Sequence, residues 1–145
     1  MVGTAALVAG LAATSFWAKI GSDIDGASAG ERLGESVAIS SDGLIMAVGG
    51  GSTGVARVYN RSADSDWSQM GDDIDPWPST QIKCLLALSS DGLRLGYLKS
   101  RRSFVLDWNG TDWVAGGNPL GFYRHFGGYL DVISLSSDGS RLASG

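Results

Sequence analysis

The sequence predicts an all-β protein built from consecutive four-stranded antiparallel units, and two repeated signatures support this. The tetrapeptide Ser-Ser-Asp-Gly occurs three times, at intervals of 49 and 47 residues, beginning at Ser40, Ser89 and Ser136. A tryptophan followed four residues later by a glycine also recurs, at intervals of 50 and 46 residues, at Trp17, Trp67 and Trp113. A period near fifty residues, with strand-like segments between turns, is typical of β-propeller blades.

The composition fits a folded, turn-rich chain. Among 145 residues there are 22 glycines, charged residues make up only 18%, and the mean hydropathy is +0.06, which argues against disorder. The net charge is −4 and the isoelectric point is about 4.7, so nucleic acid is not expected as a partner. We expect the basic cluster from Lys99 to Arg102 to lie at a solvated hairpin tip.

The N-terminal segment, residues 1–16, has two interpretations. The apolar run from Ala5 to Ala13 has the length of a signal-peptide core, but no Lys or Arg precedes it and no convincing cleavage site follows. The run is too short and too rich in Ala and Gly to span a bilayer. The favoured alternative is a degenerate blade remnant, in which Ala5 to Gly10 copies Ile45 to Gly50.

From residue 17 onward the chain reads as a partial propeller. Residues 17–20 are predicted to form an outer strand, and residues 36–75 to form the first complete blade. In that blade, Asp42-Gly43 supplies a two-residue hairpin turn, because glycine takes positive φ without steric cost. The four strands of this blade are predicted at 36–40, 44–48, 55–59 and 67–70.

A second blade is predicted at residues 82–120 and an incomplete one at 129–145. The strands of the second blade are expected at 84–88, 93–98, 103–107 and 113–115. Those of the third are expected at 131–135 and 141–143. With about 48 residues per blade, a ring of seven would need about 340 residues. The chain is therefore expected to be an incomplete ring. It is either a fragment of a longer repeat protein, the favoured interpretation, or a chain that closes a ring by self-association through its open blade edges.

The segment from Ser136 to Gly145 resembles the central hairpin of a WD40-like blade, where an S-x-D-G turn is followed by L-A-S/T-G. No Trp-Asp dipeptide closes a third strand, and Asp107-Trp108 has the reversed order. The fuller pattern, W-x-x-I/M-G-x-D-I-D followed by the turn and G-V-A-R-V-Y, is similar to WD40-like and FG-GAP-like repeats of large secreted or surface proteins of microbes. The resemblance covers residues 17–145. It implies a propeller and an extracellular or cell-surface location.

Calcium ligands are suggested by the same resemblance. FG-GAP-type loops resemble D-x-D-x-D-G, in which alternate carboxylates bind a hard cation. Here only Asp23 and Asp25 alternate before Gly26, Pro76 replaces the glycine in the second copy, and the third copy lacks the acids. Asp23 and Asp25 are therefore weak metal candidates, a polar loop between blades is favoured, and no cofactor is expected.

Two loops hold the candidate ligand-binding residues. Trp77 lies between two prolines and does not recur, so an exposed contact and a structural role are both open. Tyr123, Arg124 and His125 lie in the aromatic insert at 121–129, which could line a ligand surface or cover the core. His125 is the only histidine and lies away from Cys84, the only cysteine, so no Cys-His pair and no disulfide are predicted.

The sequence contains no phosphate-binding Walker loop and no His-rich metal signature. We therefore expect a non-enzymatic interaction module that presents loops to a protein or glycan surface. Three alternatives remain open at this point. They are a segment of a larger propeller enzyme, a calcium-dependent adhesion module, and a translated gene fragment with no role of its own.

Overall fold

The computed structural model describes residues 5–9, 17–51, 53–62, 66–75, 84–99, 102–118, 120–121 and 132–145. These residues form thirteen strands and no helix, and every strand pairing is antiparallel. The all-β prediction is therefore confirmed. Within this described part, no helix is available that could cross a membrane.

Each of the two predicted complete units forms one sheet in which consecutive strands are neighbours. The first sheet has the order β3-β4-β5-β6, with bounds Leu33–Ile39, Ile45–Gly50, Ala56–Asn60 and Ser68–Gln69. The second has the order β7-β8-β9-β10, with bounds Cys84–Leu88, Arg94–Lys99, Arg102–Trp108 and Trp113–Ala115. A short fifth strand, β11 (Leu120–Gly121), was not predicted and pairs with β9.

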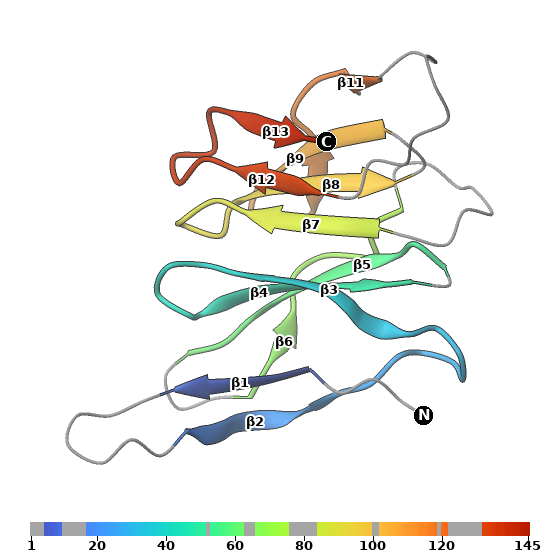
Figure 1. Cartoon of the computed structure of the whole chain (residues 1–145). Coiled ribbons are helices and arrows are strands. Elements are labelled where there is room, and N and C mark those ends of the chain that lie inside the picture. Colours follow the sequence, from blue (N-terminus) through green and yellow to red (C-terminus); the bar gives the residue numbers. More distant parts are fainter. Residues whose placement is uncertain are drawn as a thin grey trace.

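A two-stranded sheet flanks this pair on each side. One is formed by β1 (Ala5–Ala9) and β2 (Ala18–Ile24), the other by β12 (Ile133–Leu135) and β13 (Leu142–Ser144). The four sheets lie one above another, from β1–β2 at the bottom of Figure 1 to β12–β13 at the top. The described strands form an open stack, not a closed ring.

The observed strand boundaries lie close to those predicted from the sequence. Predicted strands 84–88 and 113–115 coincide with β7 and β10, and the others are displaced by a few residues. Within the N-terminal segment, β1 pairs with β2 as β5 pairs with β6. This gives β1 the position of a third strand, whereas its comparison with Ile45 to Gly50 suggested a second strand.

The core lies between the sheets. Buried residues of both four-stranded sheets form the larger cluster, which includes Ala47, Val58, Leu86, Leu95 and Tyr97. A smaller cluster lies between the first sheet and β1–β2, and it contains Ile24, Leu33, Met46 and Val48. Because the clusters lie between layers, each sheet depends on its neighbours to bury its apolar side chains.

The sheets fit together because one face carries small residues and the opposite face carries large ones. A Cβ placed on Gly49 would lie 3.2 Å from Leu86 Cδ1 of the second sheet. A Cβ on Gly96 would lie 3.1 Å from Leu142 Cδ1 and 3.4 Å from Ile133 Cδ1 of the next sheet. The large face of each sheet therefore packs on the small face of the sheet before it.

Candidate interaction surface

The three Ser-Ser-Asp-Gly turns have the same internal hydrogen bonds. In each turn the first serine hydroxyl donates to the aspartate Oδ1 at 2.6 Å, and its oxygen accepts the backbone amide five residues later at 2.9 to 3.0 Å. The serine hydroxyl and a backbone amide hold the pKa of each aspartate below its ordinary value, at about 2 for Asp138. The carboxylates therefore stay ionised as acceptors within the turn.

The turns are also bonded to one another. The Ser41 amide donates to the Ser90 carbonyl at 2.9 Å, and the Ser90 amide donates to the Ser137 carbonyl at 2.8 Å. This ladder links three consecutive sheets. At its two ends, and among the described residues, the Ser41 carbonyl accepts no such bond and the Ser137 amide donates none.

The glycines of these turns differ in what they face. Gly43, Gly92 and Gly139 all have φ between 70° and 73°. A Cβ on Gly92 would lie 2.7 Å from Ile45 Cβ, and one on Gly139 would lie 2.8 Å from Arg94 Cδ. A Cβ on Gly43 would meet nothing within 4 Å. The second and third turns thus press on the preceding sheet, whereas the first has no such neighbour.

The repeat of tryptophan and glycine also reflects a contact between consecutive sheets. Asp112 Oδ1 accepts the amides of Trp113 (2.8 Å) and Asp72 (3.2 Å), and a Cβ on Gly71 would lie 2.6 Å from this oxygen. An aspartate of one sheet therefore caps the glycine loop of the sheet before it.

Asp66 caps Gly21 in the same way, since a Cβ on Gly21 would lie 2.7 Å from Asp66 Oδ1. The predictive signal that sequence reasoning missed is the aspartate directly before the second and third tryptophans. At the two ends of the stack this arrangement is unfilled. A Cβ on Gly117 would meet nothing within 4 Å, and Trp17 is 75% exposed whereas Trp113 is 8% exposed.

An apolar face of β3 is also uncovered. Val37 is 55% exposed and Ile39 is 42% exposed. The residue at the same position relative to the turn of the second sheet, Leu86, is only 7% exposed because the first sheet covers it. We call Val37 and Ile39 the open apolar face. At the opposite end of the stack, Ser134 and Ala143 are exposed on the small-residue face of β12–β13.

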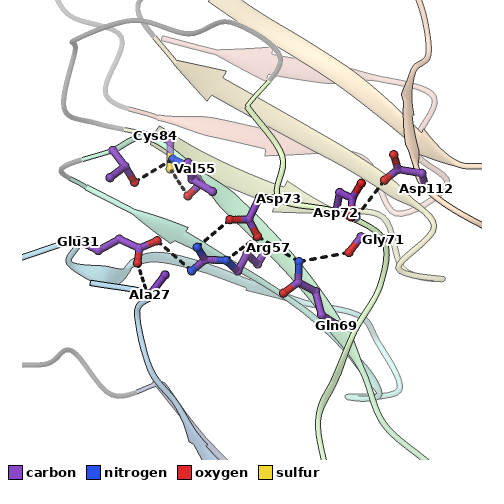
Figure 2. A network of polar contacts seen from close by, with 11 residues as sticks. Ala27, Glu31, Val55, Arg57, Gln69, Gly71, Asp72, Asp73, Cys84 and Asp112 are labelled. Carbon is purple, nitrogen blue, oxygen red and sulfur yellow. Dashed lines mark hydrogen bonds and ion pairs between the residues drawn. The ribbon is translucent and has the colours of Figure 1, made fainter. Parts of the chain in front are cut away.

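A buried polar network holds the first sheet to its flanking loops (Figure 2). Arg57 on β5 donates to Asp73 through Nε (2.7 Å) and NH2 (2.8 Å), and its NH1 lies 2.9 Å from Glu31 Oε1. The Arg57 and Glu31 side chains are 8% and 3% exposed. The hydrogen bond to Asp73 raises the pKa of Arg57 and lowers that of Asp73. These charges are satisfied by one another, as a structural ion-pair network requires.

The expectation that Lys99 lies at a solvated hairpin tip is wrong. Its side chain is fully buried, with Nζ 2.8 Å from Asp75 Oδ1 and 3.1 Å from the Thr53 carbonyl. An ion pair and a carbonyl compensate the loss of hydration, and this tertiary pairing is not visible in the local sequence. Arg102 begins β9 and is half-buried, while residues 100–101 lie outside the described part.

Cys84 is buried, as predicted. Its thiol contacts the Gly50 carbonyl at 3.7 Å, and burial raises its pKa to about 11. At neutral pH the thiol is therefore protonated and is a poor nucleophile.

Asp23 and Asp25 have different surroundings in the structure. Asp23 is paired with Lys19 at 2.6 Å, and Asp25 is exposed just beyond β2. In the next repeat, fifty residues later, the corresponding acids are Asp73 and Asp75, and side-chain cations bind both. Among the described residues, no group of three possible metal ligands is present. The alternating acids are thus engaged in ion pairs wherever the structure shows a contact.

The four candidate ligand-binding residues, Trp77, Tyr123, Arg124 and His125, lie outside the described residues. Their binding role stays a prediction. A comparison with protein-family models found no match, and a search of curated proteins found no significant similarity.

Proposed function

We propose that the chain is a non-catalytic repeat module of the β-propeller type that acts by binding a protein through its open apolar face. The observation that carries this proposal is the contrast between Val37, 55% exposed, and Leu86, 7% exposed at the same position of the next sheet. At this position of the second sheet the side chain is buried because the first sheet covers it. Burial of one such side chain contributes about 1.5 to 3 kcal/mol, which favours association.

A protein surface suits this face better than a glycan does. Val37 and Ile39 are aliphatic and exposed, and exposed apolar surface of this kind marks protein contacts. The glycan alternative rests on Trp77 and the aromatic insert, and it remains a separate prediction.

Photo-crosslinking in cells that express the chain tests this proposal. The photoreactive residue p-benzoylphenylalanine replaces Val37 in one variant and Val114 in a matched control. Val114 is 42% exposed on the outer strand β10, away from the open apolar face. We expect protein adducts at position 37 and none at position 114. Absence of adducts at position 37, or equal adducts at both positions, would overturn the proposal.

A further inference from the structure

The geometry points to a second copy of this chain as the occupant of the open apolar face. We propose that two chains join head to tail, with β13 of each pairing with β1 of the other, and close a ring of six four-stranded sheets. This inference rests on the proposed function, because it names the protein that the open face binds.

The incomplete sheets at the two ends carry complementary strands. The pair β12–β13 contains a Ser-Ser-Asp-Gly turn and so corresponds to the first and second strands of a complete sheet. The pair β1–β2 contains the glycine of the Trp17 repeat, Gly21, within β2 and corresponds to the third and fourth strands. Among the described strands, each end therefore carries the pair that would complete the sheet at the other end, and joining them gives the order β12-β13-β1-β2.

The free edge of β13 can donate hydrogen bonds to such a partner. On the side of β13 that faces β12, the Gly145 amide donates to the Val132 carbonyl and the Arg141 carbonyl accepts from the Ser136 amide. Because bonding alternates along an antiparallel strand, the intervening amides of Leu142 and Ser144 face the free edge. In the first sheet the corresponding second strand, β4, is bonded to β5 over its whole length.

The two internal sheets also give the register of the new pairing. Ile45 pairs with Asn60 in the first sheet, and Arg94 pairs with Asp107 in the second. Transferring this register to β13 and β1 pairs Arg141 with Ala9 and Ala143 with Leu7.

The faces of the two ends match in the same orientation. The open apolar face would pack on the small-residue face of the partner's β12–β13, as Leu86 packs on Gly49. The unfilled Ser137 amide of one copy would meet the unfilled Ser41 carbonyl of the other, extending the ladder of turns. Trp17 would reach the open space beside Gly117, so one arrangement forms three separate contacts between the two copies.

The number of copies follows from the strands. Leaving aside the short β11, the described residues of each chain form two complete sheets and two half sheets, equivalent to three sheets. Propellers close with about 4 to 8 sheets, so two chains give a permitted ring of six whereas three chains would give nine. Closure removes the exposed strand edges that otherwise lead to open-ended association.

Light scattering on a sizing column tests the assembly. We expect a molar mass twice that of the 15.1 kDa chain. The Ser144→Pro variant removes an edge amide and should be a monomer with an unchanged β-sheet circular dichroism spectrum. The matched control, Ala115→Pro, alters the outer strand β10, whose outer edge the proposed ring leaves unpaired, and should stay dimeric. A monomeric native chain, or a dimer that survives Ser144→Pro, would contradict the proposal.

Disulfide trapping tests the orientation and the register. Chains carrying Leu7→Cys are mixed with chains carrying Ala143→Cys, positions that the register places opposite each other at a separation that a disulfide can bridge. We expect a covalent heterodimer from this mixture, none from either variant alone, and none when Leu7→Cys is mixed with Ala115→Cys. A crosslink in the control mixture, or none in the first, would rule out the proposed pairing. Crosslinking at position 37 to a different protein would contradict the proposal that a second copy of the chain occupies the open apolar face. It would leave the proposed function standing.

Discussion

The two four-stranded sheets share strand order and turn chemistry but differ in what covers them. The second sheet has a neighbouring sheet against each of its two faces, and its Leu86 is 7% exposed. The first sheet has the two-stranded β1–β2 on one side, which leaves Val37 at 55% exposed. The comparison teaches that the repeat specifies each hairpin, whereas burial depends on the adjacent repeat.

The largest expected effect concerns the ion pairs that hold the first sheet to its flanking loops. Glu31→Ala would leave Arg57 buried without one of its two carboxylate partners, and we expect a loss of about 3 to 5 kcal/mol in unfolding free energy. The second sheet has the apolar Phe104 in the place of Arg57. Urea denaturation measures the loss. A change below about 1 kcal/mol would show that the network contributes little to folding.

Truncation at equivalent positions tests the contrast in burial. Leu86→Ala should lower the unfolding free energy by about 2 to 5 kcal/mol, because it leaves a cavity between two sheets. Val37→Ala, measured at concentrations where the chain is monomeric, should change it by less than about 0.5 kcal/mol. Equal losses in the two variants would mean that Val37 is already covered within one chain.

Alanine at the turn glycines gives a smaller contrast. Both Gly43 and Gly92 have φ of 73°, so each substitution costs about 1 to 2 kcal/mol in backbone strain. Only in Gly92→Ala does the new Cβ also meet Ile45, adding about 1 to 3 kcal/mol of overpacking. The difference between the two melting curves is the informative quantity. Identical destabilisation would indicate that the turns do not press on the preceding sheet.

Acid titration of the unfolding free energy should show the contribution of the turn aspartates to stability. Since the folded pKa of Asp138 is about 2 and its ordinary value is 3.8, its contribution to stability is present above about pH 4 and is lost as the pH falls through 2. Asp138→Asn should flatten the dependence of the unfolding free energy on pH in that window. An unchanged profile would show that the serine hydroxyl does not hold the carboxylate in its ionised form.

Calcium should have the smallest effect. Asp23 is paired with Lys19, and the corresponding acids of the next repeat are paired with Arg57 and Lys99. We therefore expect no shift in melting temperature at millimolar calcium. A clear rise would favour the calcium-dependent adhesion alternative, because a bound ion must stabilise the folded chain.

Much of the fold could be predicted because it is encoded locally. Strands 84–88 and 113–115 and the three turns follow from short apolar runs and from a glycine at positive φ. The burial of Lys99 could not be predicted in the same way. Its partner Asp75 lies 24 residues away in sequence, and only the contact between two sheets brings them together.

The sequence by itself determined the repeated antiparallel hairpins, since the hydrogen bonds of each Ser-Ser-Asp-Gly turn span only a few residues. The tertiary structure alone decided which face stays open, because Val37 and Leu86 are similar aliphatic residues in similar strands. Their exposure differs through the presence or absence of the sheet alongside. Hydrophobic burial depends on the surface that covers a side chain, and local sequence does not specify that surface.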